Sequence, residues 1–430
     1  MVGQRRRKVP LLLDGRTGEG GGQLVRIAVA LSAVTGQPIR IVNVRGNRAS
    51  SRRVGKHGSV QVTGGGLKHQ HVAAIKFLAE VTAAEVEGLA VGSKTLTFIP
   101  TLPPTALLKR NFKIVPDSSG ASTMLTFQAM LPFLLYAGDE SGSPIELELH
   151  GGTNTTMSLS YDYMDQVLMP TLEDRFGIRV ERELKSRGWV YGPPSRGCVS
   201  IRVYPLARGT PLTPIAPKKP LGDPSDYELR TVDVTVIVPL RLQETLQTAL
   251  AQSIGDLFPN AEVNFAKVED SGHGTRIYVL LVGKSSAGLR WGRDILYAVS
   301  KNNKETSATL SENIARLVAK GLFKEVEAKG QVDQHLQDQL VCYQALAAGE
   351  SSFPRRDPEP ADASAKLDSL AGKVRDIDIE GGASDDTLSE PFGHGTLHSK
   401  TARWITRCLL PATKFHDMGD VVSGAGISFT

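Results

Sequence analysis

The sequence predicts an α+β protein in which a large domain of repeated βαβαββ-like units carries a smaller α/β module. Three observations support this prediction. A strand, a glycine loop and a helix open the chain at 11–36, and a similar order recurs after residue 113. The pattern then changes between 193 and 291. With 430 residues, 40% of them hydrophobic and 22% charged, the chain has room for more than one domain.

The first element is a short apolar run that ends at Asp14. Glycines then surround a single carboxylate, Glu19, and an apolar pattern with helical spacing begins after Gln23. Glycine lets a backbone approach a ligand closely, and the free N–H groups of a helix start favour anions such as phosphate. We therefore expect a phosphate-binding loop that contains a carboxylate. The loop matches neither a P-loop nor a dinucleotide fingerprint, and a tight turn before a helix is the alternative.

A β-branched strand at 38–44 follows, and Arg45 and Arg48 lie just beyond its end. Two guanidinium groups at a strand exit can clamp phosphate oxygens, although charged surface residues are the alternative. The basic stretch 49–63 is interpreted as a loop insertion. A helix at 72–81 and strand-like residues 86–100 complete the first unit.

The second unit repeats this order with strands at 113–115 and 145–150 and helices at 122–136 and 164–176. In the module at 193–291, a β-branched strand leads into an amphipathic helix and a further strand. A helix over 307–329 is assigned to the large domain. The predicted domains are therefore 1–192, 193–291 and 292–430, the last with an acidic segment at 350–393 that is too poor in large apolar residues to fold.

Charge and cysteine content narrow the class of protein. The 50 basic and 45 acidic residues give a net charge of only +5, but basic residues gather in the N-terminal segment, which suits a polyanionic partner. The three cysteines have no metal-ligand spacing, which favours a reducing compartment. No apolar run is long enough for a membrane span, and we expect neither a secretory signal nor a membrane partner. The nucleus or the cytoplasm is the expected location.

The strings DGRTGEGGGQLVR and TGQPIRIVNVRGNR resemble the N-terminal signature of the RNA 3′-terminal phosphate cyclase family. Gly66 to His71 resemble its Gly-Leu-x-x-Gln-His helix start. HLQDQ at 335–339 is similar to its Tyr-Leu-x-Asp-Gln motif, and His398 lies thirteen residues before Pro411, at the family's histidine spacing. The chain departs from the family in the 49–63 insertion, in the Ser118 to Ser122 loop, where Ala121 replaces a glycine, and in His335, which replaces tyrosine.

The resemblance implies a mechanism and a set of site residues. An RNA 3′-phosphate end would be converted to a 2′,3′-cyclic phosphodiester by ATP through a covalent histidine-AMP on His398, with Mg²⁺ or Mn²⁺ near Glu19. The implied ATP contacts are Gln128, His335, Leu336, Gln337, Asp338 and Gln339. Arg26, Arg45 and Arg48 would hold RNA phosphates or stabilise the transferring group.

Two other functions share the expected architecture. A catalytically silent cyclase-like protein of ribosome biogenesis would bind RNA without nucleotidyl transfer, but that branch typically lacks both the histidine and the intact Gly-Glu-Gly-Gly-Gly-Gln loop. A sugar-nucleotide enolpyruvyl transferase would have no use for the histidine or the inserted module. The presence of Glu19 and His398 therefore favours the active enzyme.

Overall fold

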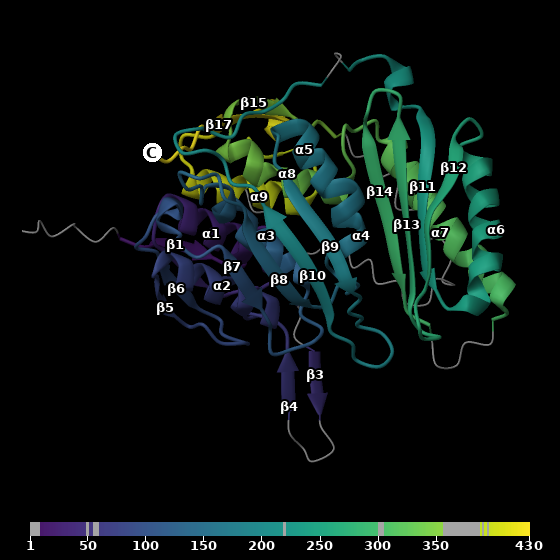
Figure 1. Ribbon diagram of the computed structural model, residues 1–430, viewed down its shortest axis with the longest axis horizontal. Helices are drawn as coiled ribbons and strands as arrows, with labels where there is room; N and C mark the ends of the chain where they lie inside the picture. The colour runs from purple at the N-terminus through teal and green to yellow at the C-terminus, as the bar shows by residue number, and fades with distance from the viewer. Residues whose placement is uncertain are drawn as a thin grey trace, which may run out of the picture.

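The computed structural model describes residues 9–48, 51–54, 60–217, 221–299, 305–355, 388, 391–393 and 395–430. Figure 1 shows a large body beside a smaller module, in which sheet and helices form two layers. The mixture of helices and sheets confirms the predicted α+β class. In the described ranges, no helix combines the length and the apolar character needed to cross a bilayer.

The first unit is a four-stranded sheet with the order β1-β2-β6-β5, in which β1 and β2 are parallel and the other neighbours antiparallel. Its elements are β1 (Leu11–Asp14), α1 (Gly22–Thr35), β2 (Ile39–Val42), α2 (His69–Thr82), β5 (Glu85–Glu87) and β6 (Leu96–Ile99). The crossover from β1 to β2 runs through α1, as parallel pairing requires. The glycine loop therefore joins the end of β1 to the start of α1.

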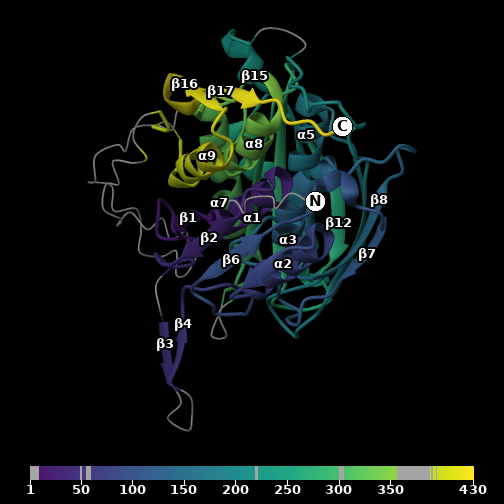
Figure 2. The ribbon, with the colours of Figure 1, turned by 90° about the vertical axis from the view of Figure 1, so that its left-hand side faces the viewer.

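The predicted loop insertion at 49–63 contains a strand pair of its own. β3 (Ser51–Val54) and β4 (Val60–Thr63) pair in antiparallel register and join neither neighbouring sheet, and residues 49–50 and 55–59 lie outside the described ranges. The pair projects away from the large body in both ribbon views (Figure 1, Figure 2). The insertion therefore adds an arm and leaves the order of the first sheet unchanged.

The second unit repeats the first. Its sheet has the order β7-β8-β10-β9, again with the first two strands parallel and the others antiparallel. Its elements are η1 (Pro104–Ala106), β7 (Asn111–Ile114), α3 (Thr123–Leu135), β8 (Ile145–Gly151), α4 (Tyr161–Tyr163), the π-helical η2 (Met164–Leu168), α5 (Met169–Phe176), β9 (Val180–Ser186) and β10 (Gly197–Val203). The identical strand order confirms the repeat that the sequence pattern predicts.

A third unit is completed by segments far apart in sequence. Its elements are α8 (Gln334–Leu346), β15 (Ala348–Ser352), α9 (Leu397–Leu409), β16 (Lys414–His416), η5 (Asp417–Gly419) and β17 (Val421–Ala425). Their sheet order, β15-β17-β16, equals that of the other units without the first strand. The backbone N–H of Ala348 donates to the carbonyl of Leu212 at 2.7 Å, so the chain around Leu212 lies beside β15 where that strand would be.

The smaller module is inserted between Leu212 and α8. It consists of η3 (Pro224–Tyr227), β11 (Leu229–Val238), α6 (Leu240–Leu257), β12 (Glu262–Asp270), β13 (Ile277–Ser285), β14 (Arg290–Tyr297) and α7 (Ser307–Glu327), with the sheet order β12-β11-β13-β14. Its helices pack together on the sheet and share one apolar core with it. The module therefore has its own hydrophobic core.

The observed packing differs from the predicted boundaries in three places. β10 pairs with β8 and β9 and belongs to the second unit, whereas 193 was the expected start of the module. Helix α7 buries Leu310, Ile314 and Leu322 in the core of the module instead of returning to the large domain. Residues 350–352 extend β15, although residues 356–387 of the predicted disordered segment lie outside the described ranges. A linear apolar pattern does not state which sheet a strand or helix joins, and this is the physical reason for the first two differences. The third arises because composition describes the whole segment, whereas its first residues pair with β17.

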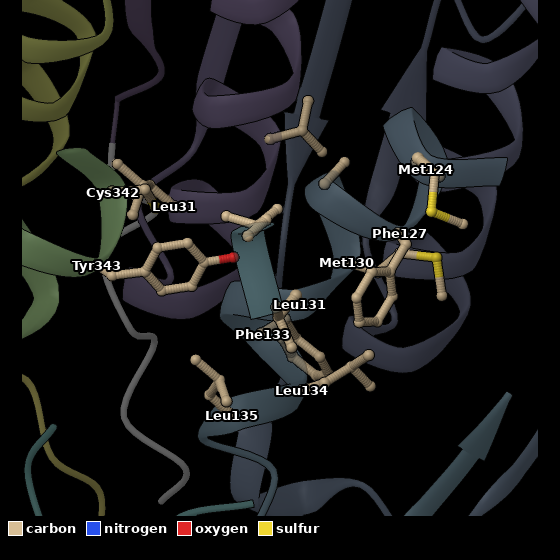
Figure 3. Close-up of a cluster of buried hydrophobic side chains, with 14 of the residues drawn as sticks. Leu31, Met124, Phe127, Met130, Leu131, Phe133, Leu134, Leu135, Cys342 and Tyr343 are labelled. Atoms are coloured by element: carbon tan, nitrogen blue, oxygen red, sulfur yellow. The ribbon is translucent and has the colours of Figure 1, made fainter. Parts of the chain in front are cut away.

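Helices α1, α3 and α8 meet in the core of the large body. Figure 3 shows Leu31 of α1, Phe133 of α3 and Tyr343 of α8 among the clustered side chains. Leu31 and Phe133 are fully buried, and Tyr343 is nearly so. This packing fixes the three helices relative to one another, and side chains from all three line the site described below.

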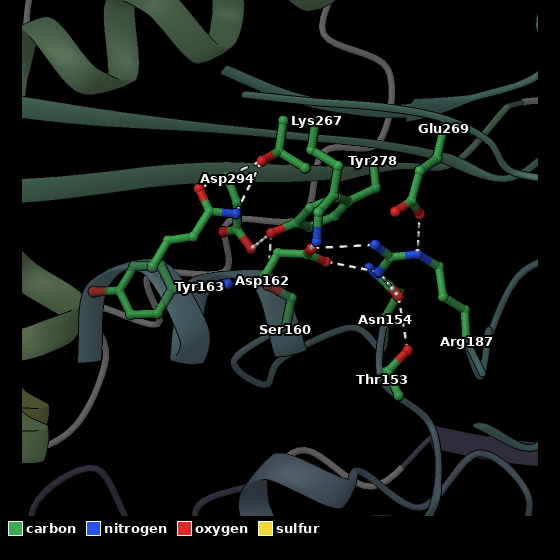
Figure 4. A network of polar contacts seen from close by, with 12 residues as sticks. Thr153, Asn154, Ser160, Asp162, Tyr163, Arg187, Lys267, Glu269, Tyr278 and Asp294 are labelled. Atoms are coloured by element: carbon green, nitrogen blue, oxygen red, sulfur yellow. Dashed lines mark hydrogen bonds and ion pairs between the residues drawn. The ribbon is translucent and has the colours of Figure 1, made fainter. Parts of the chain in front are cut away.

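A buried ionic network joins the second unit to the module (Figure 4). The fully buried Asp162 accepts hydrogen bonds from Arg187 at 2.7 and 3.1 Å and from Lys267 at 3.1 Å. Arg187 also donates to Glu269 at 2.8 Å. Burial opposes the charge on Asp162, but these hydrogen bonds outweigh it and hold the pKa of that carboxyl below its ordinary value.

Candidate active site

The glycine loop after β1 lies against the start of α9, about 380 residues further along the chain. The backbone N–H of Glu19 donates to Thr401 Oγ1 at 2.9 Å, a contact that spans 382 residues of sequence. Gly18 and Gly20 have φ values of +62° and +58°, a conformation that favours glycine. A β-carbon at Gly21 would lie 2.1 Å from the carboxylate of Glu19. The loop therefore depends on small residues to hold Glu19 beside α9.

Glu19 is a buried carboxylate with incomplete hydrogen bonding. Its side chain is only 7% exposed, and it forms an ion pair with Arg48. The Arg48 guanidinium contacts Oε1, whereas Oε2 accepts no hydrogen bond from the residues that the structure describes. An oxygen pair of this kind has the hard-ligand character that Mg²⁺ and Mn²⁺ prefer. The residues present therefore fit the predicted divalent ion.

His398 lies in the first turn of α9, where Thr396 caps the helix by accepting a hydrogen bond from Ser399 N–H at 3.2 Å. The imidazole Nε2 lies 4.0 Å from Glu19 Oε1, and its side chain is 49% exposed. Loss of hydration, then the charges of Arg48 and Arg26, lower the pKa of His398 to about 4. The ring is therefore neutral at pH 7 and partly open to a ligand, two properties that a nucleophile needs.

Gln23 connects His398 to Asp338. The amide Nε2 of Gln23 donates to Asp338 Oδ2, and its Oε1 lies 3.3 Å from His398 Nδ1. A carboxylate accepts hydrogen bonds, so the amide oxygen must face the histidine, and Nδ1 then carries the proton. This arrangement leaves the lone pair on Nε2, the nitrogen that faces Glu19.

Asp338 is a buried carboxyl on α8. Burial raises its pKa to about 7, although hydrogen bonds from Gln339 and Gln23 and the charge of Arg26 act in the opposite direction. Burial likewise lowers the pKa of Arg26, to about 10, so Arg26 remains a cation at pH 7. Both groups line one cavity together with Gln23. Such a pair of displaced pKa values is typical of functional sites.

The residues predicted to contact ATP separate into two groups. Gln128 Nε2 donates to Gln339 Oε1, and both side chains line the same cavity as Asp338. The other three have different surroundings. Leu336 is fully buried in the core. His335 Nε2 lies 3.2 Å from Nη1 of Arg293, a residue of the module. Gln337 Oε1 accepts a hydrogen bond from Ser399 Oγ at 2.9 Å. Gln337 thus supports the start of α9, which holds His398.

The predicted phosphate-binding arginines lie around the glycine loop but have different partners. Arg48 pairs with Glu19, whereas Arg45, with a positive φ of 53°, donates to the carbonyls of Gly66 and Gly65 at 3.2 and 3.4 Å. The charge of Arg45 lowers the pKa of Arg26. Arg26 and Arg45 therefore repel each other, and the charges of Arg26 and Arg48 both act on His398, which favours an anionic ligand in this region.

The set of candidate site residues omitted two that the structure brings to the site. Gln23 is the link between His398 and Asp338, and His71 lies beneath the glycine loop, where a β-carbon on Gly22 would meet its Nε2 at 2.7 Å. His71 Nδ1 accepts the Lys68 N–H at 3.0 Å, and burial keeps its pKa well below its usual value. The sequence signal was present, because both residues belong to motifs quoted above, the glycine loop and the Gly-Leu-x-x-Gln-His helix start.

Comparison with known proteins places the chain beside one family. A family model described as RNA 3′-terminal phosphate cyclase matches residues 17–365. Proteins named RNA 3′-terminal phosphate cyclase from Methanosarcina mazei and Methanopyrus kandleri are 31% and 30% identical to the chain. The first alignment covers 80% of this chain and 90% of the relative, and the second covers 79% and 87%. A protein of the same name from Pyrococcus furiosus is 30% identical, with 79% and 87% coverage.

Proposed function

The chain belongs to the RNA 3′-terminal phosphate cyclase family, and from this premise we propose that it converts RNA 3′-phosphate ends to 2′,3′-cyclic phosphodiesters. The proposed reaction consumes ATP and passes through a covalent adenylate on His398. The observation that carries the proposal is the chain of contacts from Asp338 through Gln23 to His398. It leaves a neutral imidazole with its Nε2 lone pair directed toward the buried carboxylate of Glu19.

In the first step, His398 Nε2 attacks the α-phosphorus of ATP. A P–N bond forms, the bond from the α-phosphorus to the bridging oxygen breaks, and pyrophosphate leaves with that electron pair. Positive charge develops on the imidazole as the bond forms. The Gln23 oxygen, 3.3 Å from Nδ1, stabilises that charge by accepting its hydrogen bond.

In the second step, an oxygen of the RNA 3′-phosphate attacks the same phosphorus and the P–N bond breaks, which returns His398 to its neutral form. The RNA then ends in a phosphoanhydride to AMP. In the third step, the vicinal 2′-hydroxyl attacks the phosphorus of the RNA 3′-phosphate. Its proton passes to solvent, the anhydride bond breaks, and AMP leaves. Arg26, Arg45 and Arg48 are the cations that would hold these phosphates.

A divalent ion is part of this proposal. Mg²⁺ or Mn²⁺ near Glu19 would offset negative charge on the triphosphate during the transfer. Glu19 suits this role because its oxygens are buried and Oε2 accepts no hydrogen bond within the described part of the chain. The nucleotide itself would use the cavity that Gln128, Asp338 and Gln339 line.

The test is adenylylation of the purified full chain with α-labelled ATP and Mg²⁺ or Mn²⁺, followed by denaturing electrophoresis. We expect an acid-labile label that RNA with a 3′-phosphate end releases and that is absent in His398→Ala. His416→Ala is the matched control, because His416 is an exposed histidine on β16, and it should label normally. Equal labelling of both variants would exclude His398 as the nucleophile.

A wild-type chain that never labels, yet binds the RNA, would contradict the enzyme and favour the silent RNA-binding branch. Conversion of a 3′-phosphate RNA to the cyclic end is a second readout on the same samples. Cyclisation without any protein label would retain the activity and overturn the histidine-AMP route.

A further inference from the structure

A second group of metal-binding side chains lies on the outward face of the second sheet. Glu148 and His150 are two residues apart on β8, so both project from the same face of the strand. Cys198 of β10 is paired in register with His150. Figure 1 shows these two strands as neighbours in the large body. None of the three belongs to the candidate active site.

The three ligand atoms are already close together. One oxygen of Glu148 lies 2.6 Å from His150 Nε2, and Cys198 Sγ lies 3.9 Å from the same nitrogen. All three atoms lie within 4.8 Å of one another. Tetrahedral Zn²⁺ with one sulfur, one nitrogen and one oxygen ligand requires separations of roughly 3.3–3.7 Å, which follow from its bond lengths. Shifts of about 1 Å or less in these side chains would therefore satisfy the geometry.

The backbone keeps the three side chains in place. Seven residue pairs, from Gly197 with Gly151 to Val203 with Ile145, join β10 to β8. The strand pairing fixes the positions of His150 and Cys198. The side chain of His150 is 20% exposed and Cys198 is partly buried, so both side chains remain open to solvent on one side. The other two described cysteines, Cys342 and Cys408, belong to no such group of three potential ligands in the described ranges.

We propose that Glu148, His150 and Cys198 form a zinc site with an open fourth position for water. A thiolate and an imidazole select Zn²⁺ over the hard ions Mg²⁺ and Mn²⁺, so this site and the Glu19 site differ in ligand chemistry. The ion would bind as the Cys198 thiol gives up its proton to solvent and would connect β8 to β10. The inference is independent of the proposed cyclase activity.

In the metal-free chain, a cation already pairs with Glu148. Lys113 of β7 forms an ion pair with the same oxygen of Glu148, with a separation of 2.6 Å. Zn²⁺ must displace this ammonium group, whose side chain is 62% exposed and free to move into solvent. Replacement of Lys113 by Met removes the competitor, and we expect this variant to bind the ion more tightly than the wild type.

The experiment is titration of the metal-free full chain with Co²⁺, followed by displacement with Zn²⁺. We expect one equivalent of Co²⁺ to produce a thiolate-to-cobalt charge-transfer absorption, which the Glu19 site cannot produce because it holds no sulfur. Cys198→Ser should abolish the band, and His150→Asn should raise the dissociation constant at least about tenfold. Cys408→Ser is the matched control and should leave both unchanged.

Thermal unfolding with and without Zn²⁺ provides a second readout, since an ion that binds only the folded chain raises its midpoint. The midpoint should rise in the wild type and in Cys408→Ser and stay constant in Cys198→Ser. A chain that gives no charge-transfer band, or a band that persists in Cys198→Ser, would overturn the site. Circular dichroism confirms beforehand that each variant is folded.

Discussion

Two buried polar clusters of this protein use charge in opposite ways. At the junction with the module, Asp162 is paired with Arg187 and Lys267, and hydrogen bonds between them outweigh burial. The pKa of Asp162 falls and that of Arg187 rises, so both groups are held in their charged forms. At the candidate active site burial prevails, and it raises the pKa of Asp338 to about 7 and lowers that of His398 to about 4.

These opposite pKa shifts distinguish a structural cluster from a reactive one. In a cluster whose charges are matched, removal of one partner leaves the other charge buried and lowers the free energy of unfolding. A cluster whose groups are pushed toward neutrality holds a nucleophile and a carboxylate ready to change charge. Four predictions test this distinction.

Asp162→Ala should cause the largest loss of stability, about 3–5 kcal/mol in the free energy of unfolding, because it removes the fully buried carboxylate that Arg187 and Lys267 share and leaves two cations close together without it. Urea unfolding measures it. Asp165→Ala is the control in the same helical segment, since its carboxylate is 31% exposed and pairs with Arg182, and it should cost less than about 1 kcal/mol. Equal losses of unfolding free energy in both variants would show that the Asp162 network stabilises the fold no more than an exposed ion pair does.

Glu19→Gln should affect the rate of adenylylation much more than the free energy of unfolding. We expect the rate of adenylylation to fall about 100-fold, because a preorganised carboxylate is removed from the site, while the free energy of unfolding changes by about 1 kcal/mol or less. Asp14→Asn is the matched control, since Arg16 and Asn43 already satisfy that carboxylate. A large drop in stability without a change in rate would assign Glu19 a structural role.

The pH dependence of adenylylation should reflect Asp338. With its pKa raised to about 7, the carboxyl is ionised only above that pH, and the ionised form holds the Gln23 amide in the orientation described. The rate should therefore be constant above about pH 8 and fall about tenfold per unit below pH 7. His398, with a pKa of about 4, stays neutral across this range.

The control for this pH profile is Asp338→Asn, whose amide cannot ionise. The variant should be slower and nearly independent of pH between 6 and 8. A profile in Asp338→Asn with the wild-type midpoint would show that another group titrates.

Gln128→Ala should give the smallest effect. Loss of one amide contact in the cavity should raise the dissociation constant for ATP about fivefold, which corresponds to about 1 kcal/mol, without abolishing labelling. Gln37→Ala, after the end of α1, is the control and should leave ATP binding unchanged. Isothermal titration with ATP and Mg²⁺ measures both, and equal dissociation constants would place the nucleotide elsewhere.

The sequence alone determined the fold class and the local elements. Glycines around Glu19, β-branched runs and helical spacing are local signals, because backbone conformation and side-chain burial follow them directly. The repeated unit could be predicted for the same reason, and the family motifs marked His398, Glu19 and Asp338 although they lie far apart in sequence.

The contacts among these residues depend on the folded chain. The contact of Glu19 with Thr401, the link from Asp338 through Gln23 to His398, and the pairing of His150 with Cys198 all join distant or separate strands and helices. The pKa values depend on the same packing, since loss of water and the approach of Arg26 and Arg48 are properties of the folded chain. The boundary of the module also depends on packing. The apolar stripe of α7 does not itself show which core it joins, and in the folded chain it packs in the core of the module.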